Sequence, residues 1–166
     1  IGAVSSLGKT TFINQLTDDI AKSGYDVLFF SLEMGRNEMI SKSLSREMFR
    51  KAKDKSLPLS ALEIQNLKFH GIAEQMKKQR ELLKEAIEEY GNSAKRVSII
   101  EGGFETGVNE LKEKIESYIF LNGTKPIVVI DYLQILKQSS NFFSDKQEVD
   151  HNITQLKKLS RNNDLI

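Results

Sequence analysis

The sequence of 166 residues contains no cysteine, no tryptophan and only two prolines. Because cysteine is missing, disulfide bonds and thiolate metal sites are excluded, and the two histidines, His70 and His151, are far apart in the chain. Pro58 and Pro126 stand alone, so no proline-rich linker divides the chain. The length allows one α/β domain with a hydrophobic core and is too short for two, so we expect a single domain over residues 1–166.

Long apolar runs and a strong net charge are missing as well. The longest apolar runs, such as Ile127–Ile130, are far shorter than the roughly 20 residues that span a bilayer. No signal peptide is visible, so we expect a cytoplasmic protein without a membrane partner. The formal net charge of +1 indicates no nucleic-acid partner by itself. Any contact with DNA would have to come from a local patch or from assembly.

Dense apolar runs alternate with stretches of helical periodicity along the chain. Strands are expected at 27–31, 97–100 and 127–131, because a continuous apolar run is typical of a strand covered on both faces. Ile1–Gly2 and Leu165–Ile166 resemble the end of one further strand and the start of another. Strands that alternate with helices predict an α/β fold with a mostly parallel sheet flanked by helices.

Apolar residues at helical spacing indicate which helix faces are buried. After the loop at 3–10, Phe12, Leu16 and Ile20 mark one face of a helix that ends near Gly24. A long helix from about 69 to 90 is closed by Gly91, and its apolar face consists of Ile72, Met76, Leu83 and Ile87. A helix is predicted at 36–51, with Ile40, Leu44 and Met48 on its apolar face, and another begins at the capping box Ser60-x-x-Glu63. A further helix is capped by Thr106 and carries Leu111, Ile115 and Ile119. The final helix carries Val149, Ile153, Leu156 and Leu159.

Gly8-Lys9-Thr10 lies between a strand end and an amphipathic helix, which is the setting of a phosphate-binding loop, although the general motif has glycine where this chain has Ala3. Backbone N–H groups of the loop and of the helix N-terminus point at phosphates, and Gly8 lets the backbone approach them. Lys9 supplies positive charge for the β- and γ-phosphates, and the Thr10 hydroxyl is placed to bind Mg²⁺. We predict a site for ATP and Mg²⁺ whose nucleotide-binding residues are Ser5, Ser6, Leu7, Gly8, Lys9, Thr10 and Thr11.

Two acidic residues follow predicted strands. Asp131 ends an apolar strand at the edge where ligands bind in open parallel sheets, and a carboxylate there can hold magnesium, usually through a water molecule. Glu33 follows the strand at 27–31 and should emerge at the same edge, where a glutamate can deprotonate the water that attacks the γ-phosphate. On position alone, Asp131 could form only a turn, and Glu33 could be a helix N-terminal acid favoured by the dipole.

Three sequence segments together resemble the DnaB-type replicative helicases. They are Ser31–Met34 after the second strand, Ile130–Gln134 at the strand that ends in Asp131, and Ser6–Thr10 in the loop. The family commonly has alanine where Ala3 stands, and the helix that begins with Gln147 is similar too. The resemblance runs from residue 3 to the end of the chain and is weakest between about 51 and 125, where only the order of elements matches.

The resemblance implies a RecA-like core that forms a six-membered ring and couples ATP hydrolysis to movement along single-stranded DNA and duplex unwinding in replication. It implies that Glu33 is the catalytic base, that Lys9 and Thr10 bind the phosphates and magnesium, and that Asp131 binds magnesium. Primase and a helicase loader are further partners that it implies. The family has a domain before this region and a γ-phosphate sensor and arginine finger after it, so we expect a fragment truncated at both ends.

The loop at 137–146 is a candidate DNA contact. Lys137 and Lys146 could bind phosphates, and Phe142 and Phe143 could offer a stacking surface for bases. Alternatively, the loop is a flexible surface segment whose phenylalanines pack on the domain or on a neighbouring subunit.

The helicase interpretation makes one geometric prediction: the amides around Lys9 and the carboxylates of Glu33 and Asp131 converge on a single nucleotide. Two other functions use the same phosphate chemistry. One is a RecA- or KaiC-like ATPase that acts in recombination or regulation. The other is a replication partner that binds a nucleotide as a gate and does not hydrolyse it.

Overall fold

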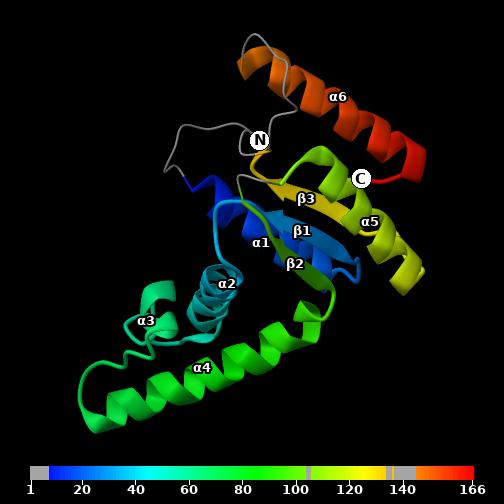
Figure 1. Ribbon diagram of the computed structural model, residues 1–166. Coiled ribbons are helices and arrows are strands. Elements are labelled where there is room, and N and C mark those ends of the chain that lie inside the picture. The colour runs from blue at the N-terminus through cyan, green and yellow to red at the C-terminus, as the bar shows by residue number, and fades with distance from the viewer. Residues whose placement is uncertain (1–7, 104–105, 134–135, 137–144) are drawn as a thin grey trace. The chain divides into compact units, whose positions relative to one another are not determined.

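The computed structural model describes residues 8–103, 106–133, 136 and 145–166 (Figure 1). These residues form two compact units, one containing helices α1 to α4 and the other containing a β-sheet with helices α5 and α6. The expectation of one domain over residues 1–166 stays a prediction. Ile1 and Gly2, the predicted end of a further strand, lie outside the described residues.

The second unit is built on a parallel sheet of three strands in the order β2-β1-β3. Its strands are β1 (Val27–Ser31), β2 (Val97–Glu101) and β3 (Ile127–Asp131). Ser31 pairs with Glu101 on one side and with Asp131 on the other, so the three strands end in register. The predicted strands and their parallel arrangement are confirmed. The Val128 N–H donates to the Ile166 carbonyl at 2.9 Å, so the last residue lies beside β3 without forming a strand.

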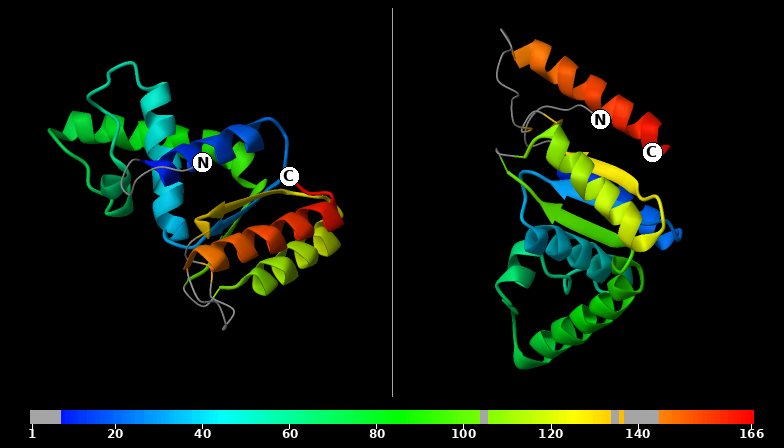
Figure 2. Two further views of the ribbon diagram at one scale, coloured as in Figure 1. Left: turned by 90° about the horizontal axis from the view of Figure 1, so that it is seen from above. Right: turned by 45° about the vertical axis from the view of Figure 1, so that its right-hand side comes forward.

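Helices α5 (Val108–Asn122) and α6 (Asp145–Asn163) lie along one face of this sheet (Figure 2). The side chains at alternate positions of a strand point to the same face, which places Leu28 and Phe30 against these helices. The buried residues of this core are Leu28, Phe30, Leu32, Leu111, Ile115, Leu136 and Leu159. Burial of this apolar surface is the main favourable contribution to the stability of the unit.

The first unit consists of α1 (Lys9–Lys22), α2 (Arg36–Lys51), α3 (Ala61–Gln65) and α4 (Ala73–Ala94). Its apolar core joins α2, α3 and α4 through Leu44, Met48, Ala52, Leu59, Ile64, Leu82, Leu83, Ala86 and Tyr90. The predicted face of α2 is confirmed, because Leu44 and Met48 are buried and Ile40 packs against them. The capping box is confirmed as well: the Ser60 hydroxyl accepts from the Glu63 N–H at 3.3 Å, and the Ser60 N–H donates to the Glu63 carboxylate at 2.7 Å.

Two predicted helix ends are wrong. Helix α4 continues through Gly91 to Ala94, because a glycine inside a helix costs only about 1 kcal/mol and the buried Tyr90 and Ser93 on either side hold the last turn. The cap of α5 is Gly107 and not Thr106. The Thr106 hydroxyl instead accepts from the Gly103 N–H at 3.1 Å.

Two predicted apolar faces are also wrong. In α1, Phe12 is 56% exposed and Leu16 is 40% exposed, whereas the polar Asn14, Thr17 and Asp18 are buried together with Ala21. In α4, Leu83 is buried as predicted, but Ile87 and the cap residue Ile72 are exposed, and the buried face consists of Gln79, Leu82, Leu83, Ala86 and Tyr90. Which face of a helix is buried depends on the elements that pack against it in the tertiary structure. Helix α2 places polar side chains against α1, and these bind the polar residues of α1.

Replacing Ile115 by alanine should lower the free energy of unfolding by about 2–5 kcal/mol, because it leaves a cavity between α5 and the sheet. Phe120→Ala on the same helix is the matched control, since Phe120 is 86% exposed and its removal leaves no cavity. Urea unfolding of both variants measures the difference. Equal midpoints for the two variants would contradict the assignment of Ile115 to the core.

Candidate functional site

The carboxyl ends of β1 and β3 bring two acidic residues to one edge of the sheet. Ser31 and Asp131 are paired in the ladder, and the Leu32 N–H donates to the Asp131 carbonyl at 2.8 Å. Glu33 follows Leu32 directly and is exposed. Glu33 and Asp131 therefore emerge at the same edge, in agreement with the sequence prediction, and it is the edge where parallel sheets bind ligands.

The turn that carries Glu33 is held from both sides. The Ser31 hydroxyl donates to the Met34 carbonyl at 2.6 Å, and the Gly102 N–H donates to the Ser31 carbonyl at 3.0 Å. A Cβ atom at Gly102 would lie 2.6 Å from Leu32 Cδ2 and 2.7 Å from the Thr106 hydroxyl oxygen, so a larger residue there would require these two side chains to shift. The sequence did not indicate the role of Gly102, because its N–H donates to the carbonyl of Ser31 in a distant part of the chain. The role of Ser31 likewise depends on the shape of the turn that follows β1.

Asp131 is a buried acidic residue with one carboxylate oxygen that lacks a hydrogen-bond partner in the described part of the chain. Its side chain is largely buried, and its Oδ2 atom has no hydrogen-bond partner among the residues that the structure describes. A buried polar oxygen without a partner costs free energy, and the cost is larger for a carboxylate. This oxygen of Asp131 is therefore suited to bind a cation.

The start of α1 has the features of a phosphate-binding turn. Gly8 caps the helix with a φ of +78°, in the left-handed region that favours glycine. Lys9 and Thr10 are half-buried in the first turn. The first N–H groups of a helix have no acceptor within the helix, so they and the helix dipole favour an anion here. Ser5, Ser6 and Leu7 lie outside the described residues, and Thr11 is exposed in the same first turn.

The predicted site residues are divided between the two units. Lys9 and Thr10 belong to the first, whereas Glu33 and Asp131 belong to the second. Their convergence on one nucleotide stays a prediction. In the described part of the chain, no three His, Asp or Glu side chains are grouped to hold a metal by themselves, so magnesium would need oxygen ligands from a bound phosphate, as is usual for this ion.

The candidate DNA-contacting residues are described only in part. Lys137, Phe142 and Phe143 lie outside the described residues. Lys146 is exposed but belongs to the first turn of α6 and not to the predicted loop, because the helix begins at Asp145. None of the helices within the described ranges combines the length and the apolar character that a membrane crossing needs.

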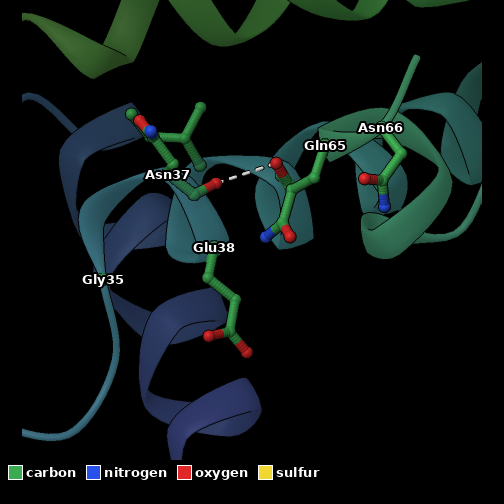
Figure 3. Close-up of a pocket in the computed structure, with 7 residues that line it drawn as sticks. Gly35, Asn37, Glu38, Gln65 and Asn66 are labelled. Atoms are coloured by element: carbon green, nitrogen blue, oxygen red, sulfur yellow. Dashed lines mark hydrogen bonds between the residues drawn. The ribbon is translucent and has the colours of Figure 1, made fainter.

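A polar hollow of about 590 Å³ lies between the start of α2 and the end of α3 (Figure 3). It is lined by Gly35, Asn37, Glu38, Ile40, Ser41, Gln65 and Asn66. The Ser41 hydroxyl donates to the Asn37 carbonyl one turn earlier at 2.8 Å, so this hydroxyl is used within its own helix. No residue of the predicted nucleotide site lines this hollow among those described.

Comparison with known proteins gives consistent matches over nearly the whole chain. The DnaB-like helicase C terminal domain family matches residues 1–165. A probable replicative DNA helicase from Trieres chinensis is 26% identical, over 94% of this chain and 31% of that protein. A solved structure of a DnaB-like replicative helicase and its interactions with primase has a TM-score of 0.77 at 26% identity, covering 98% of this chain and 35% of that one. A second solved structure, that of a helicase ATPase domain, has a TM-score of 0.77 at 26% identity, and the match covers 97% of this chain and 51% of that one.

These matches confirm the predicted RecA-like fold and the resemblance drawn from the sequence segments at 6–10, 31–34 and 130–134. A family of this kind implies that the chain binds a nucleotide. The chain spans about a third of the length of its curated relative, so it corresponds to one part of such a protein. The chain belongs to the DnaB-like helicase C-terminal domain family.

Proposed function

We propose that this chain is the ATPase motor domain of a replicative DNA helicase, which binds Mg-ATP and couples its hydrolysis to translocation on single-stranded DNA and duplex unwinding. The family match over residues 1–165 supports the helicase function. The single structural observation that carries the proposal is the pair Glu33 and Asp131 at the carboxyl edge of the sheet, with an unpartnered buried oxygen on Asp131 among the described residues.

The nucleotide is bound by residues 5–11. Lys9 contributes positive charge at the β- and γ-phosphates, and the amides at the start of α1 donate to phosphate oxygens. Gly8 has a left-handed φ and no side chain, which allows the backbone to approach the phosphates closely.

Asp131 and Thr10 hold the magnesium ion together with phosphate oxygens. When bound, the ion neutralises negative charge on the phosphates as the reaction proceeds. Asp131 supplies a carboxylate oxygen whose burial without a described partner favours a cation, and Thr10 supplies a hydroxyl from the first turn of α1.

Glu33 acts as the general base. Its carboxylate is exposed at the sheet edge, where it can accept the proton of the water molecule that attacks the γ-phosphate. The hydrogen bond from Ser31 to the Met34 carbonyl fixes the turn around Glu33, which limits the freedom of its carboxylate.

Single-stranded DNA and further copies of the same protein are the main partners in this proposal, with a ring of six subunits in the cytoplasm. Lys137, Phe142, Phe143 and Lys146 are candidate DNA contacts, through phosphates for the lysines and base stacking for the phenylalanines. Primase and a helicase loader are candidate partners, and the solved relative with primase interactions supports the former.

Unwinding of a forked duplex by the full-length protein with ATP separates this proposal from the alternatives. ATP hydrolysis without unwinding would favour a recombination or regulatory ATPase. Binding of ATP without phosphate release would favour a nucleotide-gated partner that is not an enzyme. Unwinding that depends on ATP supports the helicase.

Lys9→Ala should lower ATP hydrolysis by the full-length protein by at least about 100-fold, because the charge at the β- and γ-phosphates is lost. Phosphate release measures the effect. Lys53→Ala is the control, since Lys53 is an exposed lysine in the connection after α2. Hydrolysis at the wild-type rate in Lys9→Ala would overturn the phosphate-binding role of residues 5–11.

Glu33→Gln should lower the rate of phosphate release by on the order of 10²–10⁴ while ATP still binds, because the amide keeps the shape but cannot accept the proton. Glu101→Gln is the matched control, since Glu101 ends β2 at the same edge of the sheet and should leave the rate unchanged. An equal loss in both variants would mean that the edge needs negative charge in general and not a base at Glu33.

Asp131→Asn should raise the Mg²⁺ concentration needed for half-maximal hydrolysis by roughly 10- to 100-fold, because the neutral amide is a poorer partner for the ion. The control is Asp26→Asn at the opposite end of β1, where the Asp26 carboxylate accepts from the Thr124 hydroxyl at 2.9 Å. A Mg²⁺ titration of hydrolysis compares the two variants. The same midpoint in both would argue against magnesium binding by Asp131.

A further inference from the structure

The proposed base lies on a short backbone segment whose preceding residues are buried. Glu33 is exposed, whereas Ser31 is 1% exposed and Leu32 is 5% exposed. Because the side chain of Glu33 is not packed, the place of its carboxylate depends on the backbone that carries it. We name the segment Ser31–Met34 the base turn. The base turn and Asp131 belong to the same compact unit.

Ser31 closes the base turn with its side chain. Its hydroxyl donates to the Met34 carbonyl at 2.6 Å, so Leu32 and Glu33 lie between the donor and the acceptor. A serine hydroxyl that binds a nearby backbone carbonyl holds the chain in a conformation that is neither helix nor strand. Loss of this hydroxyl would remove a hydrogen bond that is largely shielded from water, which is unfavourable.

Leu32 ties the base turn to β3 and to the apolar core. Its N–H donates to the Asp131 carbonyl at 2.8 Å, so the residue directly before Glu33 is bonded to the residue that ends β3. Its side chain is part of the core that contains Leu28 and Leu111. The backbone on the N-terminal side of Glu33 is therefore fixed relative to Asp131.

The segment after β2 holds the base turn from the other side. The Gly102 N–H donates to the Ser31 carbonyl at 3.0 Å. A Cβ atom at Gly102 would lie only 2.6 Å from Leu32 Cδ2, so the backbone at Gly102 packs closely against the Leu32 side chain. The base turn thus has neighbours at the ends of both β2 and β3.

These contacts leave one link that holds the C-terminal side of Glu33. The bonds of Leu32 and of the Ser31 carbonyl fix the chain before Glu33. Only the bond from the Ser31 hydroxyl reaches past Glu33, to the carbonyl of the next residue. Without this bond the Glu33–Met34 peptide can rotate, and the carboxylate of Glu33 can take several positions. The side chain of Ser31 therefore restricts the base more than any other described contact of the base turn.

We propose that Ser31 is a positioning residue of the ATPase: its hydroxyl holds the base turn so that the Glu33 carboxylate keeps one place relative to Asp131. This inference rests on the proposed function. It depends only on contacts inside the second unit. Ser31 acts through Glu33 and not on the reacting atoms, because its hydroxyl proton is used in the bond to the Met34 carbonyl.

Loss of the Ser31 hydroxyl should affect the chemical step and not the binding of ATP. The residues proposed to bind the nucleotide are unchanged in such a variant, so the KM for ATP should stay close to that of the wild type. The proposed base would be misplaced for part of the time. Small misplacements of reacting groups lower the rate steeply, so the kcat should fall by on the order of 10- to 100-fold.

Ser31→Ala in the full-length protein tests the inference by steady-state phosphate release. Ser160→Ala is the matched control, because Ser160 belongs to the same unit and its hydroxyl also donates to a backbone carbonyl, that of Leu165, at 2.8 Å. The control should match the wild type in kcat and KM. Urea unfolding of both variants establishes that each is folded at the assay temperature.

A double-mutant cycle with Glu33→Gln separates positioning of the base from a general structural role. If Ser31 acts through Glu33, Ser31→Ala should lower the kcat in the wild-type background and change it by less than about twofold in the Glu33→Gln background. A structural role would give the same loss in both backgrounds. Ser31→Cys serves as a second variant in the same cycle, because the thiol has a similar size and is only a weak donor.

Each outcome of the cycle has one meaning. A kcat of Ser31→Ala equal to that of Ser160→Ala, or an equal loss in both backgrounds, would overturn the inference while the proposed function stands. A raised KM with an unchanged kcat would mean that Ser31 contacts the nucleotide, which also contradicts it. Wild-type hydrolysis by Glu33→Gln would instead remove the proposed base, and the inference with it.

Discussion

Parallel pairing of β1 with β3, in the register that sets Ser31 opposite Asp131, is the constraint on which the candidate site depends. Because both strands run in the same direction, both end at one edge, and the residues that follow them meet there. A shift by one residue would turn Asp131 to the other face of the sheet. The core of Leu28, Phe30, Leu111 and Ile115 holds this register by packing one face of the sheet against α5.

Two buried aspartates show opposite solutions to the cost of a buried carboxylate. Asp18 is surrounded by Ser43 and Arg46, so its charge is paired within the first unit. Asp131 keeps one buried oxygen without a partner among the described residues. A paired carboxylate fixes neighbouring elements, whereas an unpaired one is suited to bind a cation. The same residue type therefore ties α1 to α2 in the first unit and offers an oxygen for the proposed cation at the end of β3.

The family match and the local geometry contribute different parts of the functional proposal. Membership in the DnaB-like helicase C-terminal domain family supplies the reaction class. The structure supplies the reasons why particular residues suit it: a left-handed Gly8 before the first turn of α1, and a turn after β1 that Ser31 ties to the Met34 carbonyl. Gly102 packs closely at this edge, because a Cβ atom there would require the side chains of Leu32 and Thr106 to shift.

The sequence by itself determined the three strands and the shared edge of Glu33 and Asp131, and its loop motif is the basis of the proposed phosphate site. Dense apolar runs and a loop motif are local signals, and parallel order then fixes which strand ends meet. Only the tertiary structure decided which face of α1 is buried, because Ser43 and Arg46 of α2 make burial of Asn14 and Asp18 more favourable than burial of Phe12. It also decided that α4 continues past Gly91, since helix propensity is weak compared with packing of the residues around a glycine.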